Sequence, residues 1–296
     1  MNTRILKANL ILFMAATVWG ATFVAQRVGM DNLGPFSFSG IRFTLGALTL
    51  LPLAWRQRRL KPAAYEGVHG RFLWIWGSLL AGIAMFFGIN LQQMGLVQTT
   101  AGNGGFITGL YVVIVPILGL PFGRRPGTGV WIGAILGAVG LYFLSVTKDF
   151  SLAPGDGWVL LCAFVWAGHV WIVGYLSPRM VSSVLACGQA AVCAILSLIV
   201  AAFSTETITL AAVRGAAIPI LWGGFMSVAV GFTFQVVGQK DSPPAHAAII
   251  LSMEAVVAMF SGWLVLNEPL TARSLLGAGL MLGGMLIAQL WAIKRP

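Results

Sequence analysis

The sequence predicts an all-helical integral membrane protein with ten transmembrane helices in two inverted five-helix repeats. Its 296 residues are 58% hydrophobic and only 9% charged, against roughly 25% charged residues in a soluble domain. The mean hydropathy is +0.89. The apolar residues form runs near the ~20 residues that a spanning helix needs, without the short alternating segments of a transmembrane barrel.

Ten apolar runs follow one another along the chain. They cover residues 8–28, 35–55, 72–94, 98–120, 129–147, 157–177, 184–203, 215–238, 244–266 and 274–293. Arg4 and Lys7 precede the first run, as they would in a signal peptide. We interpret this run as a retained first helix, because nine further hydrophobic runs follow it.

The basic residues predict the orientation. If the N-terminus is cytoplasmic, 13 of the 18 lysines and arginines fall on the cytoplasmic side. Basic residues concentrate there in membrane proteins, so we expect a multi-pass bacterial inner-membrane protein with both termini in the cytoplasm. The net charge of +10 does not indicate nucleic-acid binding, because these residues lie between apolar runs and not along one face.

A weak internal repeat divides the chain into residues 1–150 and 151–296. Trp19 in the first helix aligns with Trp166 in the sixth. A shift of about 144 residues also aligns Ala101 with Ala245, Gly133 with Gly277 and Gly140 with Gly284. Five helices per repeat is an odd number, so the halves are expected to have opposite orientations, as in many transporters.

Small residues at four-residue spacing predict close helix packing. Gly133 with Gly137, and Gly279 with Gly283, have this spacing in the fifth and tenth helices.

The sequence lacks the motifs of hydrolases, kinases and nucleotide-binding proteins. The glycine-rich stretch 102–105 is not followed by the Lys-Ser/Thr of a phosphate loop. Cys162, Cys187 and Cys193 lie in apolar runs and indicate neither a disulfide nor a metal site. We therefore expect no catalytic residue, no metal and no cofactor, and transport driven by gradients.

Polar groups deep in helices are the main candidates for function, because their burial is costly without a partner or water. Glu254 lies near the middle of the ninth helix. Its candidate roles are a proton carrier, an anchor for a substrate amine, or an acid with a structural hydrogen bond. His169 could titrate near neutral pH or be structural. Arg42 is expected to extend to the membrane surface or to pair structurally.

Aromatic residues near helix centres predict either an aromatic-walled cavity or ordinary core packing, since a buried indole N–H needs a partner. Together with the polar candidates they form the predicted substrate site: Trp19, Phe23, Asn90, Thr108, Tyr111, Trp166, His169, Phe225, Ser252 and Glu254.

Three stretches carry a resemblance to a known family. They are VWGATFVAQRVGMDNLGPFSFSGIRFTLGAL, GFITGLYVVIVPILGLPFGRRP and SMEAVVAMFSGWLVLNEPLTARSLLGAGL. Their order and spacing resemble the EamA type of the drug/metabolite transporter superfamily, and within it the amino-acid exporters of the YddG type. The resemblance implies two inverted five-helix repeats and a central cavity lined by the first, third, fourth, sixth, eighth and ninth helices.

Two positions depart from the family pattern. Glu254-Ala255 stands where many members have Glu-Pro. The helix kink of those members is therefore not implied for this chain. Gly123-Arg124 replaces a common Gly-Glu.

The resulting hypothesis is a secondary transporter that exports small metabolites, foremost amino acids including aromatic ones, by alternating access. Its partners would be the small-molecule substrate and the bilayer, with protons as a candidate coupling ion and a monomeric state. The alternatives are a nucleotide-sugar or drug carrier of the same fold, or an intramembrane enzyme acting on lipid-linked substrates through Glu254 and a histidine.

Overall fold

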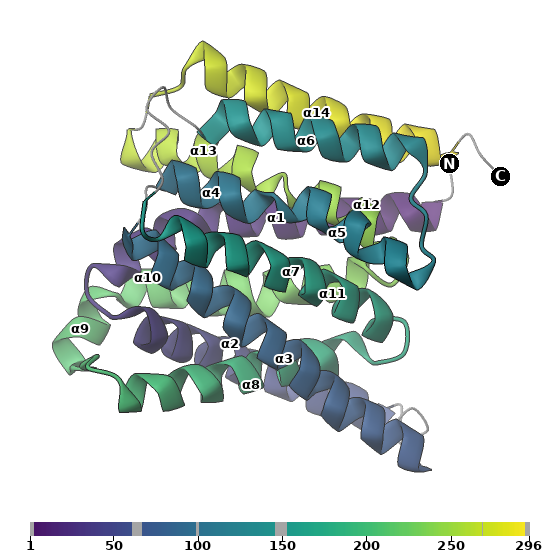
Figure 1. Ribbon diagram of the computed structural model, residues 1–296. Coiled ribbons are helices and arrows are strands. Elements are labelled where there is room, and N and C mark those ends of the chain that lie inside the picture. Colours follow the sequence, from purple (N-terminus) through teal and green to yellow (C-terminus); the bar gives the residue numbers. More distant parts are fainter. Residues whose placement is uncertain (1–2, 61–66, 99–100, 146–152, 268, 294–296) are drawn as a thin grey trace.

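A computed structural model describes residues 3–60, 67–98, 101–145, 153–267 and 269–293 of the chain as a bundle of helices (Figure 1). The helices are α1 Thr3–Met30, α2 Pro35–Leu60, α3 Gly67–Gln98, α4 Ala101–Gly109, α5 Tyr111–Gly119, α6 Thr128–Ser145, α7 Asp156–Leu176, α8 Ser182–Phe203, α9 Leu210–Gly215, α10 Ala217–Leu221, α11 Phe232–Gly238, α12 Pro244–Leu251, α13 Glu254–Leu266 and α14 Ala272–Ile293. A short 3₁₀ turn, η2 Leu120–Phe122, follows α5, and a π-helix, η3 Trp222–Gly231, joins α10 to α11.

These elements build the ten predicted membrane segments. Within the described residues, nine helical stretches are long and apolar enough to cross a bilayer. The fifth segment, Thr128–Leu144, is a shorter apolar helix, at the lower end of the ~17–25 residues that span a membrane. The predicted all-helical membrane fold is therefore confirmed.

The two halves pack against each other reciprocally. The first segment, α1, packs on the ninth segment (α12 and α13), and the sixth segment, α7, packs on the fourth (α4 and α5). The second segment, α2, lies along the seventh, α8, and the fifth, α6, lies along the tenth, α14. The first two of these contacts are equivalent when the halves are exchanged, and the last two each join corresponding segments, as a two-fold relation between the halves requires.

Glycines let α6 and α14 approach at two points. A Cβ atom at Gly133 would lie 2.8 Å from the carbonyl oxygen of Gly284, and one at Gly284 would lie 2.8 Å from that of Gly133. Gly140 and Gly277 make the same reciprocal approach, at 2.6 and 2.5 Å. Only glycine fits at distances this short, so these four positions set the helix spacing.

The predicted pair Gly279 and Gly283 does not make such a contact. Beyond the local helix backbone and the adjacent residues, no atom lies within 4 Å of a Cβ built at either position. The contacting glycines of α14, Gly277 and Gly284, are seven residues apart. Two helical turns separate them, which keeps them on one face.

The fourth and ninth segments are interrupted at matching places. Leu110 separates α4 from α5, and its N–H donates to the Ile107 carbonyl at 3.2 Å; Ser252 and Met253 separate α12 from α13, and the Met253 N–H donates to the Ile250 carbonyl at 3.1 Å. These are 3₁₀-type bonds, which often mark a hinge within a helix. The interruption before Glu254 is present although no proline follows that residue.

The ends of the bundle are tied together by polar contacts. The start of α1 and the end of α14 lie at the same end (Figure 1), where the Asn9 amide donates to the Gln289 side-chain oxygen at 2.6 Å. At the start of α2, the Glu206 carboxylate accepts from the N–H groups of Phe36 at 3.1 Å and Ser37 at 2.7 Å. A carboxylate there complements the positive end of the helix dipole.

Candidate functional site

A cavity lies where the interrupted helices meet the π-helix. Sixteen residues line it: Trp19, Thr22, Phe23, Gln26, Arg42, Ile89, Gln92, Thr108, Tyr111, Trp166, Val170, Ser227, Phe232, Gln235, Leu251 and Glu254. They come from the six segments that the resemblance implies and, through Arg42, from α2 as well. The site therefore draws on both halves of the chain.

The cavity is narrow. Its volume is about 50 Å³. One water centre needs roughly 10–15 Å³. A solute larger than a few waters therefore requires the walls to move apart.

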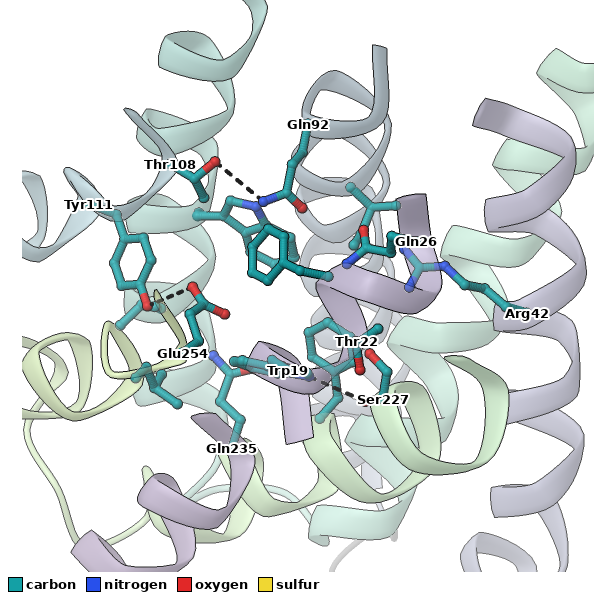
Figure 2. A pocket seen from close by; sticks show the side chains of 16 residues that line it. Trp19, Thr22, Gln26, Arg42, Gln92, Thr108, Tyr111, Ser227, Gln235 and Glu254 are labelled. Carbon is teal, nitrogen blue, oxygen red and sulfur yellow. Dashed lines mark hydrogen bonds between the residues drawn. The ribbon is translucent and has the colours of Figure 1, made fainter. Parts of the chain in front are cut away.

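Glu254 supplies an acid at the cavity wall. It is the first residue of α13, and the Tyr111 hydroxyl, from the first residue of α5, donates to its Oε1 at 3.3 Å (Figure 2). The side chain is partly exposed, to the cavity. The carboxylate thus has one protein partner and can accept further hydrogen bonds from a solute.

Arg42 supplies a cation to the same cavity. Only 1% of its surface is exposed, so the expected extension to the membrane surface is wrong. Its guanidinium carbon lies 5.3 Å from the ring centre of Phe38 and 5.1 Å from that of Phe43, within cation–π range. Nε and Nη2 have no hydrogen-bond partner among the described residues, which leaves donors for an anionic group.

The two charged side chains enter the cavity from opposite sides (Figure 2). Glu254 comes from α13 and Arg42 from α2. A solute between them meets an acid at one end and a guanidinium at the other.

Aromatic rings form part of the wall. The Phe232 ring centre lies 4.7 Å from that of Trp19 and 6.2 Å from that of Trp166, the latter pair stacked at 18°. The Trp19 indole N–H donates to the carbonyl oxygen of Ser227 in the π-helix at 3.3 Å. The predicted partner for a mid-membrane indole is therefore a backbone carbonyl.

Amides and a hydroxyl add neutral hydrogen-bonding groups. The Gln92 amide donates to the Thr108 hydroxyl at 3.3 Å (Figure 2). The side-chain oxygens of Gln26 and Gln235 are buried without a partner in the described part of the chain. Buried polar atoms are normally satisfied, so these acceptors fit a cavity that holds water or a polar solute.

Comparison with known proteins identifies the family. The sequence model of the EamA-like transporter family matches residues 6–146 and again residues 153–289. The chain belongs to this family. It is a membrane-spanning transporter of the drug/metabolite transporter superfamily.

Individual relatives agree with this EamA assignment. An uncharacterized transporter of Archaeoglobus fulgidus is 32% identical over 290 residues, covering 96% of this chain and 86% of the relative. The uncharacterized transporter YoaV of Bacillus subtilis is 26% identical, covering 94% and 95%. The threonine/homoserine exporter RhtA of Escherichia coli is 26% identical over 295 residues, covering 96% and 92%.

A solved crystal structure has the same fold. It aligns with a TM-score of 0.81 at 18% sequence identity and covers 97% of this chain and 98% of its own. At this identity the likeness concerns the fold alone.

Six of the ten residues predicted for the site line the cavity of this EamA protein. They are Trp19, Phe23, Thr108, Tyr111, Trp166 and Glu254. The other four do not line it. Phe225 is 41% exposed, and the polar ones have partners in the protein.

Those partners explain the positions of the three polar residues. The Asn90 amide donates to the Phe86 carbonyl and the Ser197 hydroxyl, both at 2.9 Å. His169 Nε2 lies 3.1 Å from the side-chain oxygen of Gln189. The Ser252 hydroxyl donates to the Ile249 carbonyl at 2.9 Å.

Other lining residues were missed at the level of sequence. Thr22 and Gln26 lie three and seven residues after Trp19, so helical spacing places all three on one face of α1. That spacing could have identified them. Arg42 carried no such signal, because the direction of a lone arginine depends on how α2 is rotated in the bundle.

The enzyme alternative required Glu254 and a histidine in one wet pocket. His169 and His246, the histidines whose side chains are described, are absent from the cavity lining. His169 packs behind the wall, with its ring centre 5.3 Å from Trp166 and 6.3 Å from Phe232. The acid and these imidazoles are therefore not brought together at the cavity.

Proposed function

We propose that this protein exports small metabolites, foremost amino acids including aromatic ones, by alternating access. One observation carries the proposal: an aromatic-walled cavity presents a carboxylate, Glu254, and a guanidinium, Arg42, from opposite sides. An amino acid has a matching ammonium, carboxylate and side chain.

Each part of the solute has a candidate partner in the cavity. The ammonium would donate to Glu254 and the carboxylate would accept from Arg42, whose planar guanidinium suits two-point recognition of a carboxylate. The side chain would lie against the rings of Trp19, Trp166 and Phe232. The relative RhtA, named a threonine/homoserine exporter, supports this substrate class.

Alternating access is supported by the shape of the molecule. The cavity has too little room for an amino acid, so binding requires the helices around it to separate. The interruptions before Tyr111 and Glu254 are the places where α5 and α13 could pivot. Inverted repeats can exchange outward-open and inward-open shapes by moving one half against the other.

The proposal includes an orientation. It places the protein in a bacterial inner membrane with both termini in the cytoplasm. Support comes from the basic residues of the sequence and from the start of α1 and the end of α14 at one end of the bundle.

The test is transport by purified protein in liposomes. Labelled amino acids, including threonine and phenylalanine, would be offered with and without an imposed pH gradient. We expect saturable uptake that is inhibited by competing unlabelled amino acids. Protein-free liposomes are the control. If folded protein transports none of them but carries a nucleotide sugar or a cationic drug, the amino-acid proposal is wrong and the alternative carrier function replaces it.

Compounds that lack one charge sharpen this test. Phenylalaninamide lacks the carboxylate, and phenylpropionate lacks the ammonium. Both should compete more weakly than phenylalanine. Equal competition by phenylalanine and by both analogues would exclude two-point recognition by Arg42 and Glu254.

A further inference from the structure

A second hollow lies on the outer face of the bundle. Helix α8 packs along both α2 and α3, whereas α2 and α3 contact each other little, so a groove runs between them with α8 as its floor. Its lining comprises Leu51, Pro52, Ala54, Trp55, Arg58, Trp74, Ile75, Ser78, Leu79, Val184, Cys187, Gly188 and Val192. Its volume is about 720 Å³, far more than that of the central cavity.

The groove is apolar and open to the bilayer. Leu51, Trp55 and Ile75 are 53%, 58% and 45% exposed along its sides. In a membrane-spanning protein such a surface faces acyl chains. A deep recess among these side chains provides more contact for one chain than a flat helix surface does.

The dimensions fit one leaflet. From Leu51 to Arg58 the groove runs ~10 Å along α2, and from Val184 to Val192 it runs ~12 Å along α8, at ~1.5 Å per residue. Half of a ~30 Å hydrocarbon core is ~15 Å. The groove therefore matches an acyl chain that begins at one membrane surface and ends near the midplane.

Arginines stand at the mouth of the groove, where α2 ends. The guanidinium carbon of Arg58 lies 4.5 Å from the ring centre of Trp74, and that of Arg59 lies 3.8 Å from that of Trp55. Arg56, Arg58 and Arg59 are all exposed at this end of α2. Clusters of this kind at the cytoplasmic end of a membrane helix attract anionic lipids.

We propose that this groove binds one anionic phospholipid. One of its two acyl chains lies on α8 between α2 and α3, and its phosphate lies at the guanidinium groups of Arg58 and Arg59. A zwitterionic lipid with the same chains fits the groove but brings no net charge to the arginines. This site is separate from the central cavity and does not depend on the transported substrate.

Native mass spectrometry of the full-length protein in detergent tests the proposal. The probes are phosphatidylglycerol and phosphatidylcholine with identical acyl chains. We expect one phosphatidylglycerol to bind more tightly than further copies and more tightly than phosphatidylcholine. The double change Arg58→Gln/Arg59→Gln should weaken phosphatidylglycerol binding by roughly 25-fold, about fivefold per guanidinium, and leave phosphatidylcholine binding nearly unchanged.

A variant that fills the groove tests the acyl-chain contact. Ile75→Trp should weaken the binding of both lipids. Leu80→Trp is its control, since Leu80 is 54% exposed on the same helix but does not line the groove. Arg124→Gln/Arg125→Gln is the control for lost charge, because both side chains are exposed and lie outside the groove.

Circular dichroism and size-exclusion chromatography establish that each variant is folded. Equal affinity for the two lipids would overturn the proposal. So would phosphatidylglycerol binding that survives both the arginine and the Ile75 changes, because the lipid would then bind elsewhere.

Discussion

The Tyr111 hydroxyl donates a 3.3 Å hydrogen bond to the Glu254 carboxylate, joining residues 143 positions apart. Each is the first residue after the interruption in its segment, one in each repeat. The bond therefore links the two matching interruptions across the centre of the molecule. Any separation of α5 from α13 must break it, and a solute or proton at Glu254 competes with it directly.

Glu254→Gln tests whether this acid couples transport to protons. The amide keeps the shape and still accepts from Tyr111, but it cannot exchange a proton at neutral pH. We expect exchange of substrate across liposomes to persist with a raised KM, because the amide has no charge to pair with the ammonium, and accumulation driven by a pH gradient to be lost. Tyr111→Phe is the control, since it removes the hydrogen bond and retains the carboxyl. An unchanged response of Glu254→Gln to the gradient would exclude Glu254 as the coupling group.

Arg42→Gln tests recognition of the carboxylate. A hydrogen bond to a charged group contributes about 1.5–3 kcal/mol, so KM for an amino acid should rise roughly 10- to 100-fold. Competition by the amino-acid amide should change little. Arg42→Lys keeps the charge and should lie between wild type and Arg42→Gln. If Arg42→Gln weakens the binding of the amino acid and of its amide equally, Arg42 shapes the cavity and does not bind the carboxylate.

His169→Asn separates a structural histidine from a titrating one. His169 is fully buried and lies 3.1 Å from Gln189. Loss of that partner should destabilise the protein by about 1–3 kcal/mol, seen as a lower thermal unfolding midpoint. The pH dependence of transport should match wild type. A shifted pH profile with unchanged stability would assign His169 to the transport mechanism.

Gly277→Ala tests the close contact between α6 and α14. The new Cβ would lie 2.5 Å from the Gly140 carbonyl oxygen, and overpacking of this kind costs about 1–3 kcal/mol. Gly279→Ala is the matched control on the same helix, since no atom beyond the local helix backbone and the adjacent residues lies within 4 Å of its Cβ. It should be neutral or stabilising by up to about 1 kcal/mol through helix propensity. Equal unfolding midpoints for both variants would contradict the packing that the structure describes.

The fold could be predicted because its main signals are local. Runs of apolar residues mark the segments whatever they pack against. Backbone N–H and C=O groups have no water to bond in the bilayer core, so each spanning segment must form a helix. The alignments of Gly133 with Gly277 and of Gly140 with Gly284 also anticipated a relation between the halves. They did not say which glycines would meet: Gly133 contacts Gly284, because the halves are inverted.

The site was predicted only in part, because a side chain's direction is a property of the packed bundle. Trp19 and Glu254 were found through their unusual depth in apolar helices. Asn90 and His169 were polar candidates too, but they point to partners within the protein. Arg42 was expected to extend to the membrane surface or to pair structurally, and only the packing of α2 places its guanidinium at the cavity.

By itself, the sequence determined that this chain crosses a membrane about ten times and that its halves are related. Hydropathy and internal repetition depend only on the order of the residues and not on their contacts. The tertiary structure alone decided which polar groups face a common cavity, where the fourth and ninth segments are interrupted, and that α2 and α3 diverge over α8. These features depend on the rotation and spacing of helices that are distant in sequence. Contacts between the repeats, such as that of Gly133 with Gly284, set that rotation and spacing.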